Sequence, residues 1–350
     1  MGSIISKVKK SKKGAREAPP AKQAPASPGP STPDSTQPQQ ETKTLSKDGR
    51  YVLPSPKIFT FTSKLHHDTY PEIDPITQSD CTGKAVLVTG SNRGIGRAIL
   101  LSYAKAGATH LALCSRDPSA SAHVAAEIRA AAAAAGRTVV PEVLELRLDV
   151  TDQAQVDAAA KEVEEKWGRL DVLVNNAGFM AEDCFEPLGV ARREDWEYTI
   201  EVSVIGAAKI TRALLPVMLK GGDKTVVNIS SIGALYPDGG AEAYGISKMI
   251  LCRAAEFLSV GYAKEDFLAF SVHPGGIDTP LARNMPEDFH QYLCDKEELP
   301  SDSIVYLTSK RPTWLAGRFI NANWDMPELL AKEKEIVEGD LLKFKCLGLF

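Results

Sequence analysis

The chain has 350 residues, of which 43% are hydrophobic and 25% charged, and its formal net charge at pH 7 is −4. This length allows one large α/β domain or about two smaller ones. No run approaches the roughly 18 uncharged apolar residues that a spanning helix needs, and the composition excludes collagen-like and disulfide-scaffold proteins. The slightly negative charge gives no general attraction to nucleic acid, so we expect no nucleic-acid partner.

Residues 1–50 have the composition of a disordered tail. Seven prolines fall between Pro19 and Pro38 among small and polar residues, and such a segment cannot bury enough apolar surface to offset its ordering entropy. Residues 1–22 carry seven basic side chains against one acid. The tail and the acidic remainder are therefore expected to have different partners.

The first residues, MGSIIS, fit the myristoylation pattern with Gly2 as acceptor, and the basic run KVKKSKK follows directly. An acyl chain and a basic cluster are the two signals that stable anchoring requires. We expect a cytoplasmic protein that acylated Gly2 can tether to a membrane surface. A chance match on a solvated basic tail is the alternative, and a mitochondrial presequence is a weaker option.

The six cysteines form no C-x-x-C pair, and no histidine stands beside them at zinc-ligand spacing. The N-terminus has no apolar segment typical of a secretory signal. We therefore expect reduced, intracellular thiols, mostly buried, and no metal site.

Beyond the tail, residues 51–83 show little periodicity and are expected to form an arm on the domain surface. From residue 84 apolar runs alternate with helical patterns, which predicts strands at 85–90, 110–116, 170–178, 225–231, 268–276 and 317–322, and one that ends with LRLDV (146–150). The intervening patterns predict helices near 119–135, 152–167, 193–220 and 243–263. The near-continuous apolar strands indicate a parallel sheet covered on both faces. Right-handed crossovers make residues 84–325 a single Rossmann-type, doubly wound α/β domain, followed by a helical extension over 326–350.

The segment TGSNRGIG (89–96) follows the first strand and opens a helix. Its glycines, Gly90, Gly94 and Gly96, would let the backbone approach a pyrophosphate closely, and the helix N-terminus favours negative charge. The strand–turn–helix context favours phosphate binding over a purely structural turn.

Tyr244 and Lys248 stand four residues apart on one predicted helix, so their side chains share a face. An ammonium beside a phenol stabilises the phenolate and lowers its pKa from about 10. Tyr244 could then donate a proton to a carbonyl oxygen or accept one from an alcohol. Ser231 ends a strand that faces the same cleft. His273 also ends a strand, and we interpret it as a packing residue rather than a second base; nothing marks Cys114 or Cys184 as a nucleophile.

Taken together, these motifs resemble the short-chain dehydrogenase/reductase family. The T-G-x-x-x-G-x-G spacing is followed by NNAG (175–178), Ser231, Tyr244-x-x-x-Lys248 and PGGIDT (274–279), over about residues 84–325. The resemblance implies that Tyr244 and Lys248 are catalytic and that Ser231 hydrogen-bonds the substrate oxygen. It also implies a cofactor site formed by Gly90, Ser91, Asn92, Arg93, Gly94, Ile95, Gly96, Ser115, Arg116, Asp149, Val150, Asn176, Ala177, Gly178, Tyr244, Lys248, Pro274, Gly275, Ile277 and Thr279.

The chain departs from the family at one catalytic position. Relatives carry asparagine in a V-N-x-x-G context on the preceding long helix, whereas this chain has Ser203 in V-S-V-I-G (202–206). The family's asparagine positions a water in the proton relay, and a serine hydroxyl is shorter and has one donor where the amide has two. The relay is therefore expected to be slower, rewired or absent.

The cofactor type is inferred from two arginines. The second strand ends in Cys114-Ser115-Arg116, without the aspartate by which NAD-dependent relatives bind the ribose diol. Arg116, together with Arg93 in the glycine loop, occupies positions where relatives contact the 2′-phosphate, and guanidinium groups suit a phosphate well. NADP(H) is the expected cofactor, although Arg116 could instead pair with Asp117 and Arg93 could be solvated.

Residues 280–312 are expected to form a mobile loop and helices over the substrate. They mix apolar and acidic side chains without a basic cluster, which favours a small, neutral, fairly apolar carbonyl compound or alcohol. YPEIDP (70–75) and the C-terminal segment resemble short-chain reductases of fungal secondary metabolism. The leading hypothesis is an NADP(H)-dependent oxidoreductase that forms a homodimer through its two long helices. A catalytically weak NADP-binding scaffold or sensor is the alternative, and redox-neutral dehydration is a third possibility.

Overall fold

The computed structural model describes residues 57–117, 119, 121–236 and 241–346, and the backbone of two short paired strands, β1 (Thr44–Leu45) and β2 (Tyr51–Val52). The expected disordered tail, its basic cluster and the acylation site at Gly2 lie outside these residues, apart from β1. Among the described residues, no helix has the length and apolar character needed to span a bilayer.

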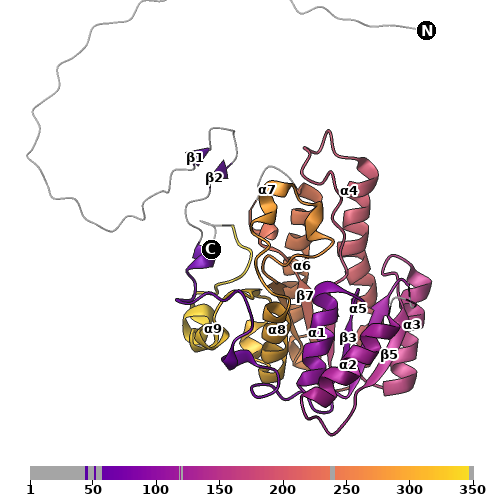
Figure 1. The fold of residues 1–350 in the computed structure, drawn as a ribbon. Helices are drawn as coiled ribbons and strands as arrows, with labels where there is room; N and C mark the ends of the chain where they lie inside the picture. The colour runs from indigo at the N-terminus through magenta and orange to yellow at the C-terminus, as the bar shows by residue number, and fades with distance from the viewer. Residues whose placement is uncertain are drawn as a thin grey trace, which may run out of the picture. The chain divides into compact units, whose positions relative to one another are not determined.

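A seven-stranded parallel sheet forms the centre of the domain (Figure 1). Its spatial order is β5-β4-β3-β6-β7-β8-β9, so the chain builds outward from β3 in one direction and then in the other. This reversal is the doubly wound topology expected from the sequence. The strands are β3 (Ala85–Val88), β4 (His110–Ser115), β5 (Glu142–Arg147), β6 (Val172–Asn175), β7 (Thr225–Ile229), β8 (Leu268–His273) and β9 (Phe319–Asn321).

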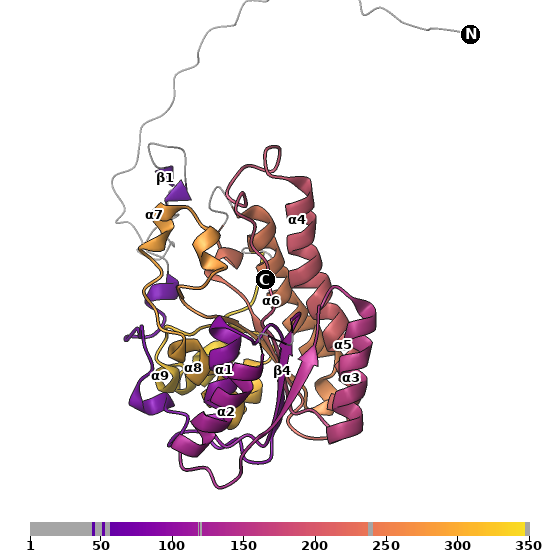
Figure 2. The ribbon, with the colours of Figure 1, turned by 45° about the vertical axis from the view of Figure 1, so that its right-hand side comes forward.

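Helices cover both faces of the sheet, as Figure 2 shows from the side. One face carries α1 (Gly94–Lys105), α2 (Ala122–Ala134) and α8 (Glu298–Lys310); the other carries α3 (Gln153–Trp167), α4 (Arg193–Ile200), α5 (Ala207–Met218) and α6 (Glu242–Gly261). Strand β3 divides its side chains between the two cores, with Val86 and Val88 on one side and Ala85 and Leu87 on the other. Both faces of the strand are therefore buried, which explains its uninterrupted apolar sequence.

The predicted long helix at 193–220 is helical from Arg193 to Met218, but it is not α-helical throughout. Between α4 and α5 the segment Glu201–Gly206 is π-helical. Gly206 allows this segment to approach Val150 closely, because a Cβ on residue 206 would lie 2.5 Å from the Cγ2 atom of Val150. Ser203 lies inside this irregular turn, and such turns are frequent at functional sites.

Most described residues of the arm before the domain are exposed, as expected of a surface segment, but several of its side chains enter the core. Ile73 is fully buried, and the Trp324 indole donates a hydrogen bond of 2.6 Å to the carbonyl of Ile58. The hydroxyl of buried Tyr70 accepts one of 2.7 Å from the backbone N–H of Met326, at the start of α9 (Met326–Ala331). The arm thus connects to the C-terminal segment, which continues into α10 (Glu333–Glu338).

The segment expected to cover the substrate also needs correction. Residues 298–308 on α8 are buried except at the first position, and α8 packs against α1. Leu299, Ile304 and Val305 are fully buried there. Within the expected segment, the residues that remain available to border a substrate are those before α8, including the short helix α7 (Glu287–His290).

All six cysteines are free. Cys81, Cys114 and Cys252 are buried, Cys184 is half-buried, and Cys294 and Cys346 are exposed. Three of the six thiols are thus buried, so the expectation of mostly buried thiols holds only in part.

Candidate active site

The glycine loop joins the end of β3 to the start of α1. Gly90 and Gly94 have φ values of 63° and 54°, a region that favours glycine. A Cβ on Gly96 would lie 2.6 Å from both the Gly90 oxygen and the Asn176 Nδ2 atom, so only glycine fits there. Among the described residues no side chain caps the N-terminus of α1. The first N–H groups of α1 are thus available to an anion, and this loop fits a dinucleotide pyrophosphate.

The NNAG segment after β6 braces this loop. Asn176 donates from Nδ2 to the carbonyls of Thr89 and Gly90, at 2.8 and 3.0 Å. The Thr89 hydroxyl accepts from the backbone N–H groups of Asn176 and Ala177. Asn175 turns away and bonds Thr211 and Asn228 inside the fold. Of the two asparagines, Asn176 therefore stabilises the glycine loop, and Asn175 bonds inside the core.

Some residues expected at the cofactor site use their side chains to shape the turns. Ser91 is fully buried and its hydroxyl bonds the backbone of Val88 and Cys114. Ser115 holds the next turn through the backbone of Asp117. Their contribution to a ligand would come from the backbone. Among the other expected residues, Asn92 and Ile95 are half-buried within the glycine loop.

At the end of β5, Asp149 is half-buried and one carboxylate oxygen accepts from the backbone and hydroxyl of Thr151, at 2.9 and 2.7 Å. Val150 is buried against Gly206. These two hydrogen bonds to Thr151 hold the turn in place. Both use the same oxygen of Asp149, so its second carboxylate oxygen makes no bond to Thr151.

The PGGIDT segment meets the glycine loop from the other side of the cleft. A Cβ on Gly94 would lie 3.5 Å from the Thr279 methyl group. Gly275, which follows Pro274, has a φ of 93°, and the N–H of Gly276 donates to Asp295 at 2.6 Å. Ile277 is buried and pairs with Asp295 in an isolated bridge. Asp295 thus fixes the backbone of a segment that the sequence assigned to nicotinamide binding.

Tyr244 and Lys248 lie in the first two turns of α6, and the Lys248 Nζ lies near Gly178 of the NNAG segment. The Lys248 Nζ atom donates to the carbonyl of Ile229 at 3.0 Å and is almost fully buried. Burial lowers the pKa of Lys248 to about 8. Ser231 follows β7, and its hydroxyl accepts from the Gly233 N–H at 3.1 Å. Ser230 points away and bonds the carbonyl of Lys248, as the alternation of the strand predicts.

The acidity of Tyr244 differs from the expectation. Burial raises the pKa of Tyr244 to about 12, and a side-chain hydrogen bond with Ser231 opposes the shift only in part. The net shift is therefore upward, and Lys248 is not among the groups that set it. Tyr244 is therefore protonated at neutral pH, the form that can donate a proton.

Ser203 lies close to Gly178, as Lys248 does. Its hydroxyl is fully buried and has no hydrogen-bond partner among the described residues. A Cβ on Gly178 would lie 3.4 Å from the Lys248 Nζ and 3.8 Å from the Ser203 Oγ. Gly178, Lys248 and Ser203 therefore border one small space.

The two arginines expected at the 2′-phosphate are both exposed. Arg116 Nη1 donates to the Tyr198 hydroxyl at 3.3 Å. The Asp117 carboxylate instead accepts two bonds from Ser119, and no ion pair joins it to Arg116 among the described residues. The pairing considered as an alternative is therefore not formed.

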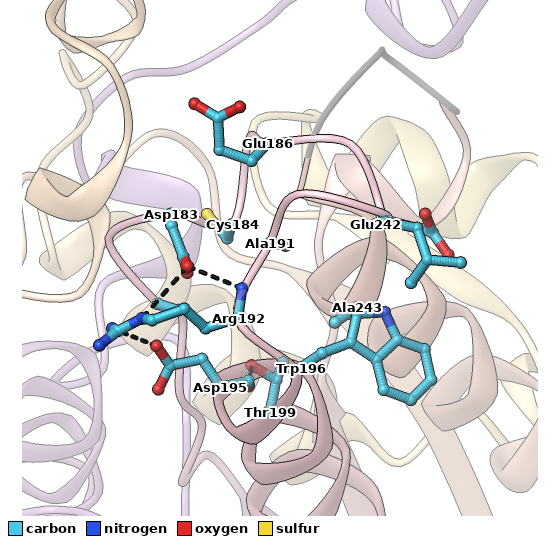
Figure 3. Close-up of a pocket in the computed structure, with 12 residues that line it drawn as sticks. Asp183, Cys184, Glu186, Ala191, Arg192, Asp195, Trp196, Thr199, Glu242 and Ala243 are labelled. Carbon is cyan, nitrogen blue, oxygen red and sulfur yellow. Dashed lines mark hydrogen bonds and ion pairs between the residues drawn. The ribbon is translucent and has the colours of Figure 1, made fainter.

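Sequence reasoning missed a pocket between residues 181–192, α4 and the start of α6 (Figure 3). Its wall combines Trp196, Cys184 and Ala243 with the guanidinium of Arg192, which pairs with Asp183 and Asp195. Ala243 adjoins Tyr244, and electrostatic repulsion from Cys184 contributes to the raised pKa of the Tyr244 phenol. The segment gave no sequence signal because its contributing residues follow no motif.

The remaining candidates, His273, Cys114 and Cys184, lie in environments typical of structural rather than catalytic residues. Burial lowers the pKa of His273 to about 4, and its Nδ1 accepts from the N–H of Ile232 at 3.1 Å. This acceptor bond fixes the backbone beside Ser231, in line with a packing role. Burial raises the pKa of both Cys114 and Cys184, so neither thiol has the character of a nucleophile.

Known proteins are similar to this chain over most of its length. The family model described as short chain dehydrogenase matches residues 84–289. Short chain dehydrogenase mpl6 of Monascus purpureus is 47% identical over 298 residues, which cover 85% of this chain and 99% of that protein. This agrees with the expected likeness to short-chain reductases of fungal secondary metabolism.

Solved structures of two reductases are also similar to this chain. L-Sorbose reductase from Gluconobacter frateurii, in complex with NADPH and L-sorbose, is 27% identical with a TM-score of 0.61 over 70% of this chain and 97% of that one. A 3-ketoacyl-(acyl-carrier-protein) reductase from Brucella melitensis, in complex with NADH, is 25% identical with a TM-score of 0.61 over 69% and 97%. The chain belongs to the short-chain dehydrogenase family, whose members are oxidoreductases that bind nicotinamide cofactors.

Proposed function

We propose that the protein is an NADP(H)-dependent oxidoreductase that interconverts a carbonyl group and a secondary alcohol on a small, fairly apolar molecule. The observation that carries the proposal is the proximity of Tyr244 to Ser231 and to Lys248, whose Nζ lies 5.2 Å from the centre of the Tyr244 ring. When bound, the nicotinamide dinucleotide supplies or accepts the hydride.

The chain's own residues handle the proton. Tyr244 holds its phenolic proton at neutral pH and donates it to the carbonyl oxygen as negative charge develops there. Ser231 hydrogen-bonds Tyr244 and would orient the same oxygen. Because the phenol is protonated over the physiological range, it is in the form that donates a proton during reduction.

The proton lost by Tyr244 must be replaced. We propose that Ser203 takes over the role of the relay asparagine by holding a water in the space shared with Lys248 and Gly178. The unpartnered, buried Ser203 hydroxyl supports this role, since such a group is costly unless a water satisfies it. Ser203→Ala should lower the catalytic rate about tenfold without changing dinucleotide affinity, and Ser203→Thr, which keeps the hydroxyl, should retain more activity.

The preference for NADP(H) rests on Arg93 and Arg116, which are exposed and offer two guanidinium groups where relatives contact the 2′-phosphate. The known complexes of related proteins include both NADH and NADPH. The proposal of a fairly apolar substrate rests on the sequence, because residues 280–312 mix apolar and acidic side chains without a basic cluster.

The decisive experiment combines purified protein with NADPH and a panel of ketones and quinones, with Tyr244→Phe as the matched variant. We expect NADPH oxidation by the wild type and its loss, by a factor of 10² or more, in the variant. Dinucleotide binding, measured by fluorescence, should persist in the variant, so that its loss of turnover is not a loss of the cofactor. Tight binding without turnover of any carbonyl would favour the scaffold or sensor function, for which the replacement at Ser203 is the supporting observation.

Two further features of the proposal concern assembly and location. Large apolar side chains on α6 are exposed, including Phe257 at 73% and Val260 at 79%, and they support a homodimer that buries this face. Light scattering of the wild type and Phe257→Glu tests this. The cytoplasmic location with membrane tethering through Gly2 rests on the sequence alone. Incorporation of labelled myristate that is lost in Gly2→Ala would support it.

A further inference from the structure

We propose that His67, Cys294 and Asp295 form a binding site for a zinc-like divalent ion. The imidazole, thiol and carboxylate ligand atoms all lie within 4.8 Å of one another. They come from two distant parts of the chain, the arm and the segment that precedes α8. Nitrogen, sulfur and oxygen in this combination are the ligand types of zinc, and the thiol argues against magnesium or calcium.

The distances suit one shared ion. The Cys294 sulfur lies 3.9 Å from both the His67 Nδ1 and the Asp295 Oδ1. Zn–S bonds of about 2.3 Å and Zn–N bonds of about 2.0 Å at tetrahedral angles separate two such ligand atoms by roughly 3.5 Å. The His67 Nδ1 and Asp295 Oδ1 now lie 2.5 Å apart in a hydrogen bond, so the ion would enter between them with a small movement of the imidazole.

Neighbouring groups already hold the ligands in place. The second carboxylate oxygen of Asp295 accepts from the Gly276 N–H at 2.6 Å and from Asn323 Nδ2 at 3.0 Å, which leaves Oδ1 facing the site. The backbone oxygen of His67 accepts from the Lys296 N–H at 2.9 Å. Outer-shell bonds of this kind orient ligands and are a regular part of zinc sites.

The site is accessible from solvent. The His67 side chain is 63% exposed and Cys294 is exposed, whereas the Asp295 side chain is only 5% exposed. An ion can therefore enter from one side, and water can complete a fourth position. Binding releases the thiol proton and breaks the hydrogen bond between His67 and Asp295.

A bound ion would connect parts of the molecule that matter for the cleft. His67 belongs to the arm, and Asp295 holds Gly276 in the segment proposed to contact the nicotinamide. Binding to the folded chain alone raises thermal stability by mass action. The ion would therefore stiffen the junction between the arm and this segment, independently of whether the proposed reaction is correct.

The test uses untagged full-length protein and Co²⁺ as a spectroscopic probe, followed by displacement with Zn²⁺. We expect one equivalent of Co²⁺ to produce a thiolate charge-transfer absorption band that Zn²⁺ abolishes. Cys294→Ser should remove the band, and His67→Ala should weaken Co²⁺ and Zn²⁺ binding at least tenfold. Cys346→Ser, which changes the other exposed thiol, is the matched control and should behave like the wild type.

Zinc competition against a chromophoric chelator gives the affinities, and circular dichroism checks the fold of each variant. The substitutions alter exposed side chains, so folding should persist. An equal band in the wild type and Cys294→Ser would overturn the proposal, as would loss of the band in Cys346→Ser or no binding at micromolar metal. A melting temperature that Zn²⁺ raises in the wild type but not in His67→Ala would support it.

Discussion

The Nζ atom of Lys248 lies 5.2 Å from the centre of the Tyr244 ring. The two groups are neighbours on one face of α6, yet burial shifts both toward their neutral forms: it lowers the pKa of Lys248 to about 8 and raises that of Tyr244 to about 12. The site therefore has a phenol that keeps its proton and an ammonium that gives its proton up near physiological pH.

This difference predicts the pH dependence of reduction. Lys248 is charged below pH 8 and neutral above it, whereas Tyr244 stays protonated over the whole range up to about pH 12. If the ammonium supports the reaction, kcat/KM for the dinucleotide should fall up to tenfold per pH unit above about pH 8. Initial rates between pH 6 and 10 measure this profile. A rate that stays flat to pH 10 would contradict the assignment to Lys248.

The tight packing at Gly96 predicts that a larger residue there disturbs the glycine loop. An added methyl group would meet the Gly90 oxygen and the Asn176 amide at 2.6 Å, so the glycine loop must shift. Gly96→Ala should weaken dinucleotide binding at least tenfold and lower stability by about 1–3 kcal/mol. Titration calorimetry and urea unfolding measure both effects. Gly261→Ala, at the end of α6 where a Cβ meets nothing within 4 Å, is the control and should bind the dinucleotide normally.

The exposed guanidinium of Arg116 predicts cofactor preference. Removing one charge-assisted hydrogen bond to a 2′-phosphate costs about 1.5–3 kcal/mol. Arg116→Ala should therefore raise KM for NADPH about tenfold or more and leave KM for NADH nearly unchanged. Arg212→Ala, at an exposed position on α5, controls for the loss of a surface charge. Equal effects on both dinucleotides would exclude a phosphate contact by Arg116.

Buried His273 predicts sensitivity to acid. Between its ordinary pKa of 6.5 and its folded value of about 4, the unfolded chain takes up a proton at this position that the folded chain does not. Its contribution to stability is thus complete above pH 6.5 and is lost as the pH falls toward 4, at up to about 1.4 kcal/mol per pH unit. From pH 7 to 5, His273→Gln should lose about 2 kcal/mol less than the wild type in urea unfolding. A variant on exposed His123 of α2 serves as the control.

Sequence patterns were informative where burial is uniform along a strand or a motif has fixed spacing. Six of the seven strands are buried along almost their whole length and were predicted from apolar runs, as at Val86 and Leu87. Strand β5 lies at the edge of the sheet and alternates between exposed and buried residues, and only its end was predicted. The convergence of Gly96 with Asn176 and of Gly94 with Thr279 follows from their positions at the carboxyl ends of parallel strands.

Other features depend on long-range contacts that periodicity does not encode. The direction of the pKa shift of Tyr244 is set by desolvation, which the i, i+4 spacing to Lys248 does not reveal. His67 and Cys294 are 227 residues apart, so no local ligand spacing could pair them. The π-helical turn around Ser203 also lies within an otherwise ordinary helical pattern.

The burial of the arm redefines where the folding unit starts. The family match begins at residue 84, but Ile73 is fully buried and the Trp324 indole bonds Ile58. A protein shortened to the family boundary would expose the apolar face around Trp324 and Met326 that the arm now covers. Such a fragment would tend to aggregate, so the shortest well-behaved enzyme should begin before Ile58 and retain α9.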